Sequence, residues 1–121
     1  MNKRKVDRLI PEAQKALVTA GVANNGRIEK TFRGQISTFG AAVMNGSLIS
    51  AVAFFSDNGG SSVERKKLLE VIRLLIPEAQ AYDNLFEYVK KKGKTNEAAV
   101  RELIMNAAIA AKLAMNLFEL K

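Results

Sequence analysis

The chain has 121 residues, with 19 Lys and Arg against 12 Asp and Glu and a net charge of +7. It contains no cysteine and no histidine. The lack of cysteine excludes a disulfide framework and a thiolate zinc site, and the lack of histidine removes the commonest general base and metal ligand. The length predicts one domain over residues 1–121. The positive charge favours a polyanionic partner, most often a nucleic acid, over a merely basic surface.

Three helices are predicted in the first half of the chain, because apolar residues recur there at helical spacing. Gly21 and the Asn24-Asn25-Gly26 sequence indicate the end of the first helix. The expected helices cover about residues 4–20, 29–45 and 47–56.

Residues 34–56 carry no charge, and their number approaches the about 20 apolar residues of a membrane-spanning helix. However, seven of these residues are polar and three are glycines, which disfavours a span. The sequence Asn45-Gly46-Ser47 favours a turn. We therefore interpret the segment as two short buried helices that meet at this turn.

Two more helices are predicted between residues 57 and 91. Asp57-Asn58-Gly59-Gly60 indicates a loop, and Ser61 and Glu64 have the spacing of a capping box that opens a helix. Pro77 interrupts the apolar pattern, because proline is tolerated in the first turn of a helix but kinks its interior. The predicted helices cover about 62–76 and 78–91.

A last helix is predicted over about 96–119, with Thr95 or Asn96 as its cap. Between Leu103 and Phe118 the only charged residue is Lys112, so this helix is expected to be buried on most sides. No segment shows the period-two alternation of a strand. The predicted fold class is therefore all-α: a single α-helical domain, a compact bundle of five to six helices with a long, largely buried C-terminal helix.

The sequence offers little for catalysis or metal binding. The carboxylates are scattered beside Lys and Arg, no Gly-rich phosphate loop is present, and Asp57–Gly60 lacks the later ligands of a calcium loop. We expect no catalytic residue, no metal, no cofactor and no enzymatic activity. The N-terminal sequence MNKRKVDRLIPEA lacks the apolar core of a secretory signal, and a cytoplasmic protein is expected.

The basic residues form four clusters. The cluster Arg65-Lys66-Lys67 opens a predicted helix, where the helix dipole disfavours cations, so a reason other than helix stability is indicated. The cluster at 90–94 suits a helix C-terminus, where cations offset the dipole. The clusters are Lys3, Arg4, Lys5 and Arg8; Arg27, Lys30 and Arg33; Arg65, Lys66 and Lys67; and Lys90, Lys91, Lys92 and Lys94.

The stretch FRGQISTFGAAVMNGSLISAVAFF resembles the most characteristic region of the small α-helical subunit of type III-B (Cmr) CRISPR RNA-silencing complexes. In that family a basic residue precedes a helix, a small turn, a Leu and a Leu-Ala-Phe-like element. Here these positions hold Arg33, Leu48 and Val52-Ala53-Phe54. The stretch TNEAAVRELIMNAAIAAKLAMNLFE resembles the family's last helix, with Lys112 at a recurrent basic position. The chain departs from the family where Ser47, rather than glycine, directly precedes Leu48.

The resemblance implies a noncatalytic subunit that lines the channel holding guide RNA paired with target RNA. Base pairing then reads the sequence, and the protein supplies backbone contacts. The implied partners are guide RNA and target RNA, other Cmr subunits and copies of the chain itself, in antiviral defence. The residues expected to contact RNA are Arg27, Lys30, Arg33, Arg65, Lys66, Lys67 and Lys112.

Two other functions stay open at the level of sequence. A helical adaptor would bind only protein, with its positive charge matching an acidic partner. A nonspecific DNA-binding protein, the less favoured alternative, would bind duplex DNA and RNA alike. For Lys112 the alternative to an RNA contact is snorkelling, in which its methylenes cover apolar surface while the ammonium reaches water.

Overall fold

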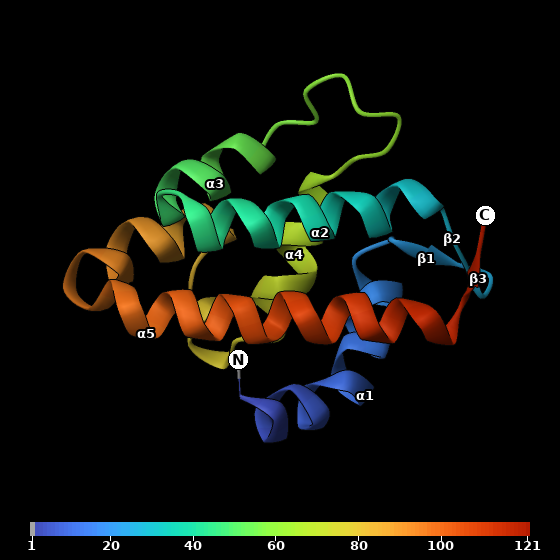
Figure 1. Cartoon of the computed structure of the whole chain (residues 1–121), viewed down its shortest axis with the longest axis horizontal. Helices are drawn as coiled ribbons and strands as arrows, with labels where there is room; N and C mark the ends of the chain where they lie inside the picture. Colours follow the sequence, from blue (N-terminus) through green and yellow to red (C-terminus); the bar gives the residue numbers. More distant parts are fainter. Residues whose placement is uncertain (1) are drawn as a thin grey trace.

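The first helix, α1 (Lys3–Thr19), begins at a side-chain cap. The Asn2 side chain accepts a hydrogen bond from the Lys5 backbone N–H at 3.2 Å, which satisfies one donor of the first turn. Val6, Ala13 and Leu17 form the buried stripe of α1. The structure, a computed structural model, describes residues 2–121, and Figure 1 shows α1 crossing the long C-terminal helix.

The uncharged segment forms two helices joined by a tight turn, as predicted. Helix α2 spans Lys30–Asn45 and helix α3 spans Leu48–Phe55, and the Ser47 side chain caps α3 by accepting from the Ser50 N–H at 3.3 Å. The rings of Phe39 and Phe55 pack edge to face at 5.3 Å and hold the two helices together. Within residues 2–121, no helix has the length and apolarity needed to cross a membrane.

The predicted start of the fourth helix is wrong. Helix α4 spans Lys66–Leu74, and the segment before it is not helical. The Ser61 hydroxyl accepts from the Val63 N–H at 3.3 Å, and the Glu64 carboxylate pairs with Lys67 at 3.0 Å, so these side chains do not form the capping box. Positive φ angles at Gly59 and Gly60 turn the chain instead.

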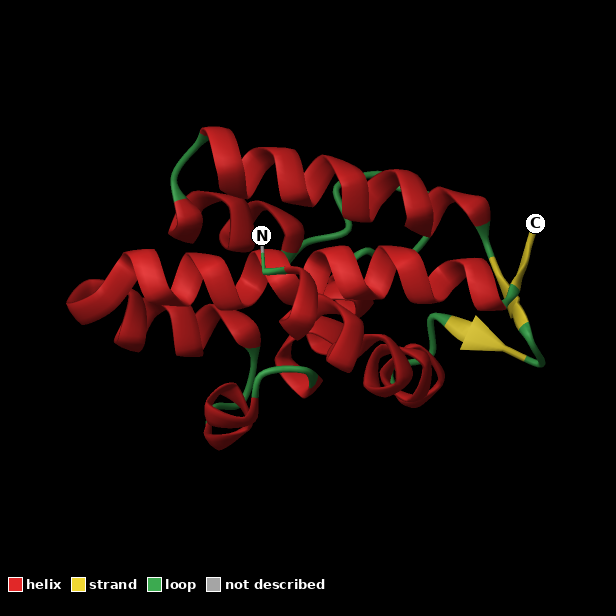
Figure 2. Cartoon of the chain, turned by 60° about the horizontal axis from the view of Figure 1, so that its bottom comes forward, coloured by secondary structure: helices red, strands yellow, loops and turns green. Residues whose placement is uncertain are grey.

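The second half differs from the prediction at residues 77–84. The short 3-10 helix η1 spans Pro77–Ala81, and α5 (Leu85–Ala114) begins after Asn84, whose side chain accepts from the Glu87 N–H at 2.9 Å. Non-helical angles at Asn96 (φ −155°, ψ 63°) divide α5 into two segments, which confirms the predicted helix boundary there. The chain turns back at this bend (Figures 1 and 2).

A miniature sheet, absent from the predictions, joins the chain's C-terminal end to the loop after α1. Strand β1 (Ala23–Asn24) pairs antiparallel with β2 (Arg27–Ile28), and β2 pairs parallel with β3 (Glu119–Leu120). A 3-10 turn, η2 (Met115–Leu117), links α5 to β3, so the last predicted helix ends earlier than expected. Figure 2 shows the strands at the opposite end of the molecule from the bend of α5.

The core surrounds α5, which contacts each of the other four α-helices. Five alanines of α5 are buried, and their small side chains allow the neighbouring helices to approach closely: Ala107, Ala108, Ala110, Ala111 and Ala114. The all-α fold class with a long C-terminal helix is thus confirmed, with the small sheet as an addition. The uncharged segment is not entirely core, however, because Met44 and Phe54 are 68% and 64% exposed.

Candidate nucleic-acid interface

The predicted cluster Arg27, Lys30 and Arg33 lies at the end of the bundle that carries the sheet. Arg27 is on β2 and Lys30 is the first residue of α2, and both are exposed. Arg27 Nε lies 3.6 Å from Glu119 Oε2 on β3, with both side chains more than half exposed. In water such a pair contributes little to stability, so Arg27 is accessible to another anion.

Backbone pairing fixes the start of α2 beside the sheet. The Lys30 N–H donates to the Lys121 carbonyl oxygen at 2.7 Å, and the Lys121 N–H donates to the Ile28 carbonyl oxygen at 2.9 Å. Ile28, between Arg27 and the helix, is buried. The backbone that carries the cluster is therefore hydrogen-bonded to the C-terminal residue. The cations of the cluster gain nothing from the helix dipole at this terminus.

Arg33 lies one turn into α2 and is half-buried. Its Nε is buried and has no hydrogen-bond partner among residues 2–121. It lines a hollow of about 350 Å³ together with Lys30, Gly34, Ser37 and Leu120. A buried N–H without an acceptor is costly. The guanidinium of Arg33 nevertheless places a positive charge beside this hollow.

Lys112 is placed near Arg33 by the register of α2 against α5. The two helices run antiparallel (Figure 1), and a Cβ added at Gly40 would lie 3.8 Å from Met105 Cε. Each residue advances about 1.5 Å along a helix. Lys112 is seven residues after Met105 on α5, and Arg33 is seven residues before Gly40 on α2, so in this antiparallel pair the two residues lie at the same level. Two turns from Met105, Lys112 also lies on nearly the same face of α5. Lys112 is half-buried there.

Lys67 joins this end of the molecule from α4. Together with Arg27 and Lys121 it lines a second hollow of about 380 Å³, which also contains Glu29 and Glu64. The hydrogen bond from Lys67 and its charge lower the pKa of the Glu64 carboxyl. The two carboxylates offset part of the positive charge here. We call Arg27, Lys30, Arg33, Lys67 and Lys112 the sheet-end basic face.

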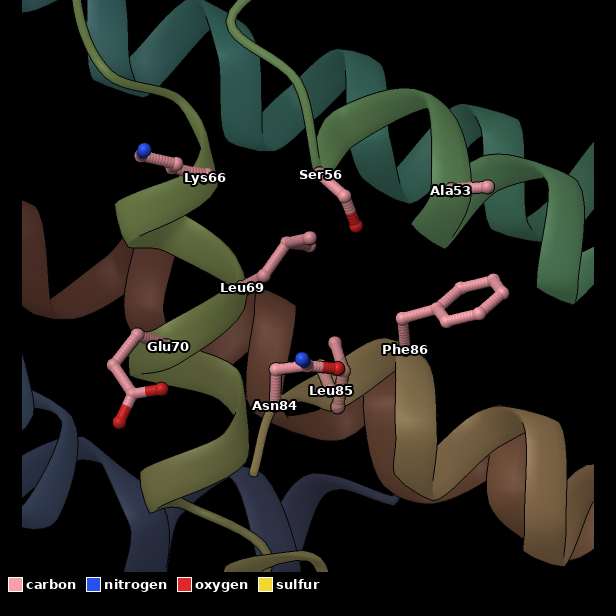
Figure 3. A pocket seen from close by; sticks show the side chains of 8 residues that line it. All are labelled: Ala53, Ser56, Lys66, Leu69, Glu70, Asn84, Leu85 and Phe86. Carbon is pink, nitrogen blue, oxygen red and sulfur yellow. The ribbon is translucent and has the colours of Figure 1, made fainter. Parts of the chain in front are cut away.

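Lys66 points elsewhere. Consecutive helical residues are separated by about 100° around the axis, so neighbours in sequence do not share a face. Lys66 lines a third hollow between α3, α4 and the start of α5 (Figure 3), and no residue of the three strands lines this hollow. The predicted triplet Arg65-Lys66-Lys67 therefore does not act as one patch.

The structure corrects the expectation for Arg65. This residue is 7% exposed, and its guanidinium donates to the carbonyl oxygens of Asp57 at 2.6 Å and Phe54 at 2.8 Å. It also stacks over the rings of Phe54 and Phe55. Arg65 fixes the loop between α3 and α4 and does not present its charge at the surface.

The two remaining basic clusters lie outside the sheet-end basic face. Lys3, Arg4, Lys5 and Arg8 are exposed on the first turns of α1. Lys90 to Lys94 lie at the bend of α5, at the opposite end from the sheet, and Lys90 pairs with Glu87 at 2.8 Å. Among residues 2–121, no group of three or more acidic, His or Cys side chains is placed to hold a metal ion.

Comparisons of the chain with protein-family models, with curated proteins and with solved structures gave no significant match.

The position of Lys121 beside Arg27 and Lys67 is not predicted by the sequence. Arg27, Lys30 and Arg33 are close together in the sequence, although Arg27 lies on β2 and not on α2 as a helical spacing of three would suggest. Nothing local in the sequence indicates that the C-terminal strand returns to β2. A parallel pairing of two-residue strands leaves no periodic signal.

Proposed function

We propose that the chain is a noncatalytic small subunit of a type III-B (Cmr) ribonucleoprotein, whose sheet-end basic face lies along guide RNA paired with target RNA. The resemblance of residues 32–55 and 95–119 to that family motivates the proposal. The observation that carries it is the meeting of Arg27, Lys30, Arg33 and Lys67 from three elements at one end of a helical bundle.

The proposed role is contact with phosphates. The cationic side chains project from a strand and from helix starts and lie beside open hollows, and few aromatic residues are available to stack on bases. Such contacts position an RNA duplex without reading its sequence. The proposed partners are the guide and target RNAs, larger Cmr subunits and copies of the chain, in the cytoplasm. The isolated chain is expected not to cleave RNA.

A salt titration of RNA binding by the isolated protein tests whether its cationic side chains bind RNA phosphates. With about four phosphates neutralised, log affinity should fall with log salt at a slope of about −3 on single strands, and affinity should be roughly micromolar or weaker. Replacing Arg27, Lys30 and Arg33 by Gln should make the slope shallower by about two. The matched control replaces Lys3, Arg4 and Lys5 by Gln, which removes the same charge from α1.

The outcomes separate the candidate functions. A flat salt dependence, or equal losses from the two triple variants, would contradict RNA binding by the sheet-end basic face. Equal binding to duplex DNA and to RNA would favour the DNA-binding alternative.

Exposed apolar residues on α2 and α3 favour the alternative function of a protein-binding adaptor. Met44, Ile49 and Phe54 are exposed on α2 and α3, next to a hollow of about 480 Å³ lined by residues that include Ala42, Ser50 and Phe54. Exposed apolar patches often mark protein interfaces. Capture of protein partners with no nucleic acid, from cells that make this protein, would favour the adaptor.

A further inference from the structure

The hollow between α3, α4 and α5 has the size and the lining of a binding site. Its volume is about 480 Å³, which lies within the usual range for ligand sites. Figure 3 shows the Leu69 side chain and the Ser56 hydroxyl pointing into it, with Asn84 and Leu85 at its lower side and Lys66 and Glu70 along α4. None of these residues belongs to the sheet-end basic face.

The apolar part of the hollow suits aliphatic side chains. Leu69 and Leu85 are buried beneath it, and the half-buried Phe86 and the exposed Ala53 flank it. Burying a leucine-sized side chain against such a surface contributes about 2 kcal/mol of transfer free energy. The hollow is therefore shaped for an apolar group rather than for a hydrated ion.

The polar groups of the hollow match a peptide group. The Ser56 hydroxyl donates to the Val52 carbonyl oxygen at 2.8 Å, which leaves its oxygen free to accept. The Asn84 Oδ1 accepts from the Glu87 N–H at 2.9 Å, which leaves its Nδ2 free to donate. A backbone amide offers one donor and one acceptor in return. In a helix the N–H and C=O groups are already hydrogen-bonded to each other, so a partner segment that uses them here must be extended.

The charge at the rim selects an acidic segment. Glu70 is neutralised by two hydrogen bonds from Arg73, at 2.5 and 2.9 Å. The Lys66 ammonium has no carboxylate within ion-pair distance in the described part of the chain. Among residues 2–121, Lys66 is therefore the one cationic residue that lines the hollow, on a protein whose net charge is +7.

We propose that the α3–α4–α5 hollow binds an extended acidic segment of a partner protein, with aliphatic side chains at alternate positions. Alternate residues of an extended segment point to the same side, so two leucines reach the apolar wall together. The peptide group between them pairs with Ser56 and Asn84, and a flanking carboxylate lies near Lys66. This site is separate from the proposed RNA contacts and does not depend on them.

Titration of the isotope-labelled full chain with blocked peptides, followed by NMR, tests the proposal. The probes are ELELE, its neutral counterpart QLQLQ and its truncated counterpart EAEAE. ELELE should shift the methyl signals of Leu69 and Leu85 and the side-chain amide signal of Asn84. QLQLQ should bind about threefold more weakly, and EAEAE should produce no shifts at these residues.

Variants separate the three contacts. Lys66→Gln should remove the preference for ELELE over QLQLQ, and Ser56→Ala should weaken both peptides about fivefold. Ala53→Trp, an exposed change on α3, should block the hollow and weaken binding at least about tenfold. The matched control Ala98→Trp lies on an exposed face of α5 outside the hollow and should change nothing.

Several results would overturn the proposal. These are an absence of shifts at Leu69, Leu85 and Asn84 with ELELE, equal binding of ELELE and EAEAE, and unchanged binding in both Ser56→Ala and Ala53→Trp. A short single-stranded RNA that shifts the same signals in place of the peptide would assign the hollow to RNA instead.

Discussion

The guanidinium carbon of Arg65 lies 4.4 Å from the centre of the Phe54 ring, and Nη2 of the same side chain donates to the Phe54 carbonyl oxygen at 2.8 Å. One side chain thus holds both the ring and the backbone at the end of α3. Because Arg65 immediately precedes α4, this contact sets where α4 starts relative to α3. These contacts explain why Arg65, which was predicted to contact RNA at the surface, is buried.

Arg65→Met should destabilise the fold without altering the sheet-end basic face. The change removes two charge-assisted hydrogen bonds and the stacking on Phe54, and it leaves carbonyl oxygens without a donor. We expect the free energy of unfolding to fall by about 2–3 kcal/mol. Urea unfolding followed by circular dichroism measures this, with the exposed Lys91→Met as the control. Equal midpoints for the two variants would show that Arg65 is not a structural residue.

Tyr88→Phe should reveal a buried hydroxyl that resists ionisation. Tyr88 is fully buried and donates to Glu78 Oε1 at 2.7 Å. Burial, followed by the hydrogen bond to Glu78 and its charge, raises the pKa of the Tyr88 hydroxyl well above its ordinary value. At neutral pH the wild type should be more stable than Tyr88→Phe by about 1 kcal/mol.

The advantage of the wild type over Tyr88→Phe should depend on pH in one direction only. The pKa of the Tyr88 hydroxyl is higher in the folded chain than in the unfolded chain. The hydroxyl therefore makes its full contribution to stability below the unfolded tyrosine pKa of about 10. Above it the unfolded chain ionises first, and the advantage should decline by up to about 1.4 kcal/mol per pH unit. Urea unfolding of both proteins across the alkaline range measures the difference. A constant difference through that range would contradict the raised pKa.

Lys112→Met should separate a phosphate contact from snorkelling. The change keeps length and apolarity but removes the charge that we place level with Arg33. Folding should be unchanged, whereas RNA retention by the assembled complex should weaken and its salt dependence should become shallower by about one ion. Unchanged retention across a salt series would remove Lys112 from the sheet-end basic face and leave the fold assignment intact.

The helices that the sequence predicted well are those whose burial pattern is local. The first three begin and end within one residue of the prediction, because apolar stripes such as Phe32, Ile36, Phe39 and Val43 face the core directly. The predicted start of α4 was wrong. It was based on the local spacing of Ser61 and Glu64, whereas the contact of Arg65 with Phe54 joins residues that are farther apart in the sequence. Tertiary contact overrode the capping signal there.

The candidate site was predictable in part for the same reason. Arg27, Lys30 and Arg33 were grouped by spacing along one segment, and they lie at one end of the molecule. Lys66 and Lys67 were grouped by adjacency, although adjacent helical residues face different directions. The link between Lys30 and Lys121 joins segments far apart in sequence, and a single sequence carries no signal for it.

Affinity purification of the tagged protein from the cells that make it, with sequencing of bound RNA and mass spectrometry of bound proteins, tests whether the chain is a subunit of a Cmr ribonucleoprotein. The account predicts that guide RNA and larger Cmr subunits copurify with the wild-type chain. It also predicts that the Arg27, Lys30 and Arg33 triple variant still copurifies with the proteins but retains less RNA in a salt wash. Partners that include no Cmr subunit and no guide RNA would contradict the account.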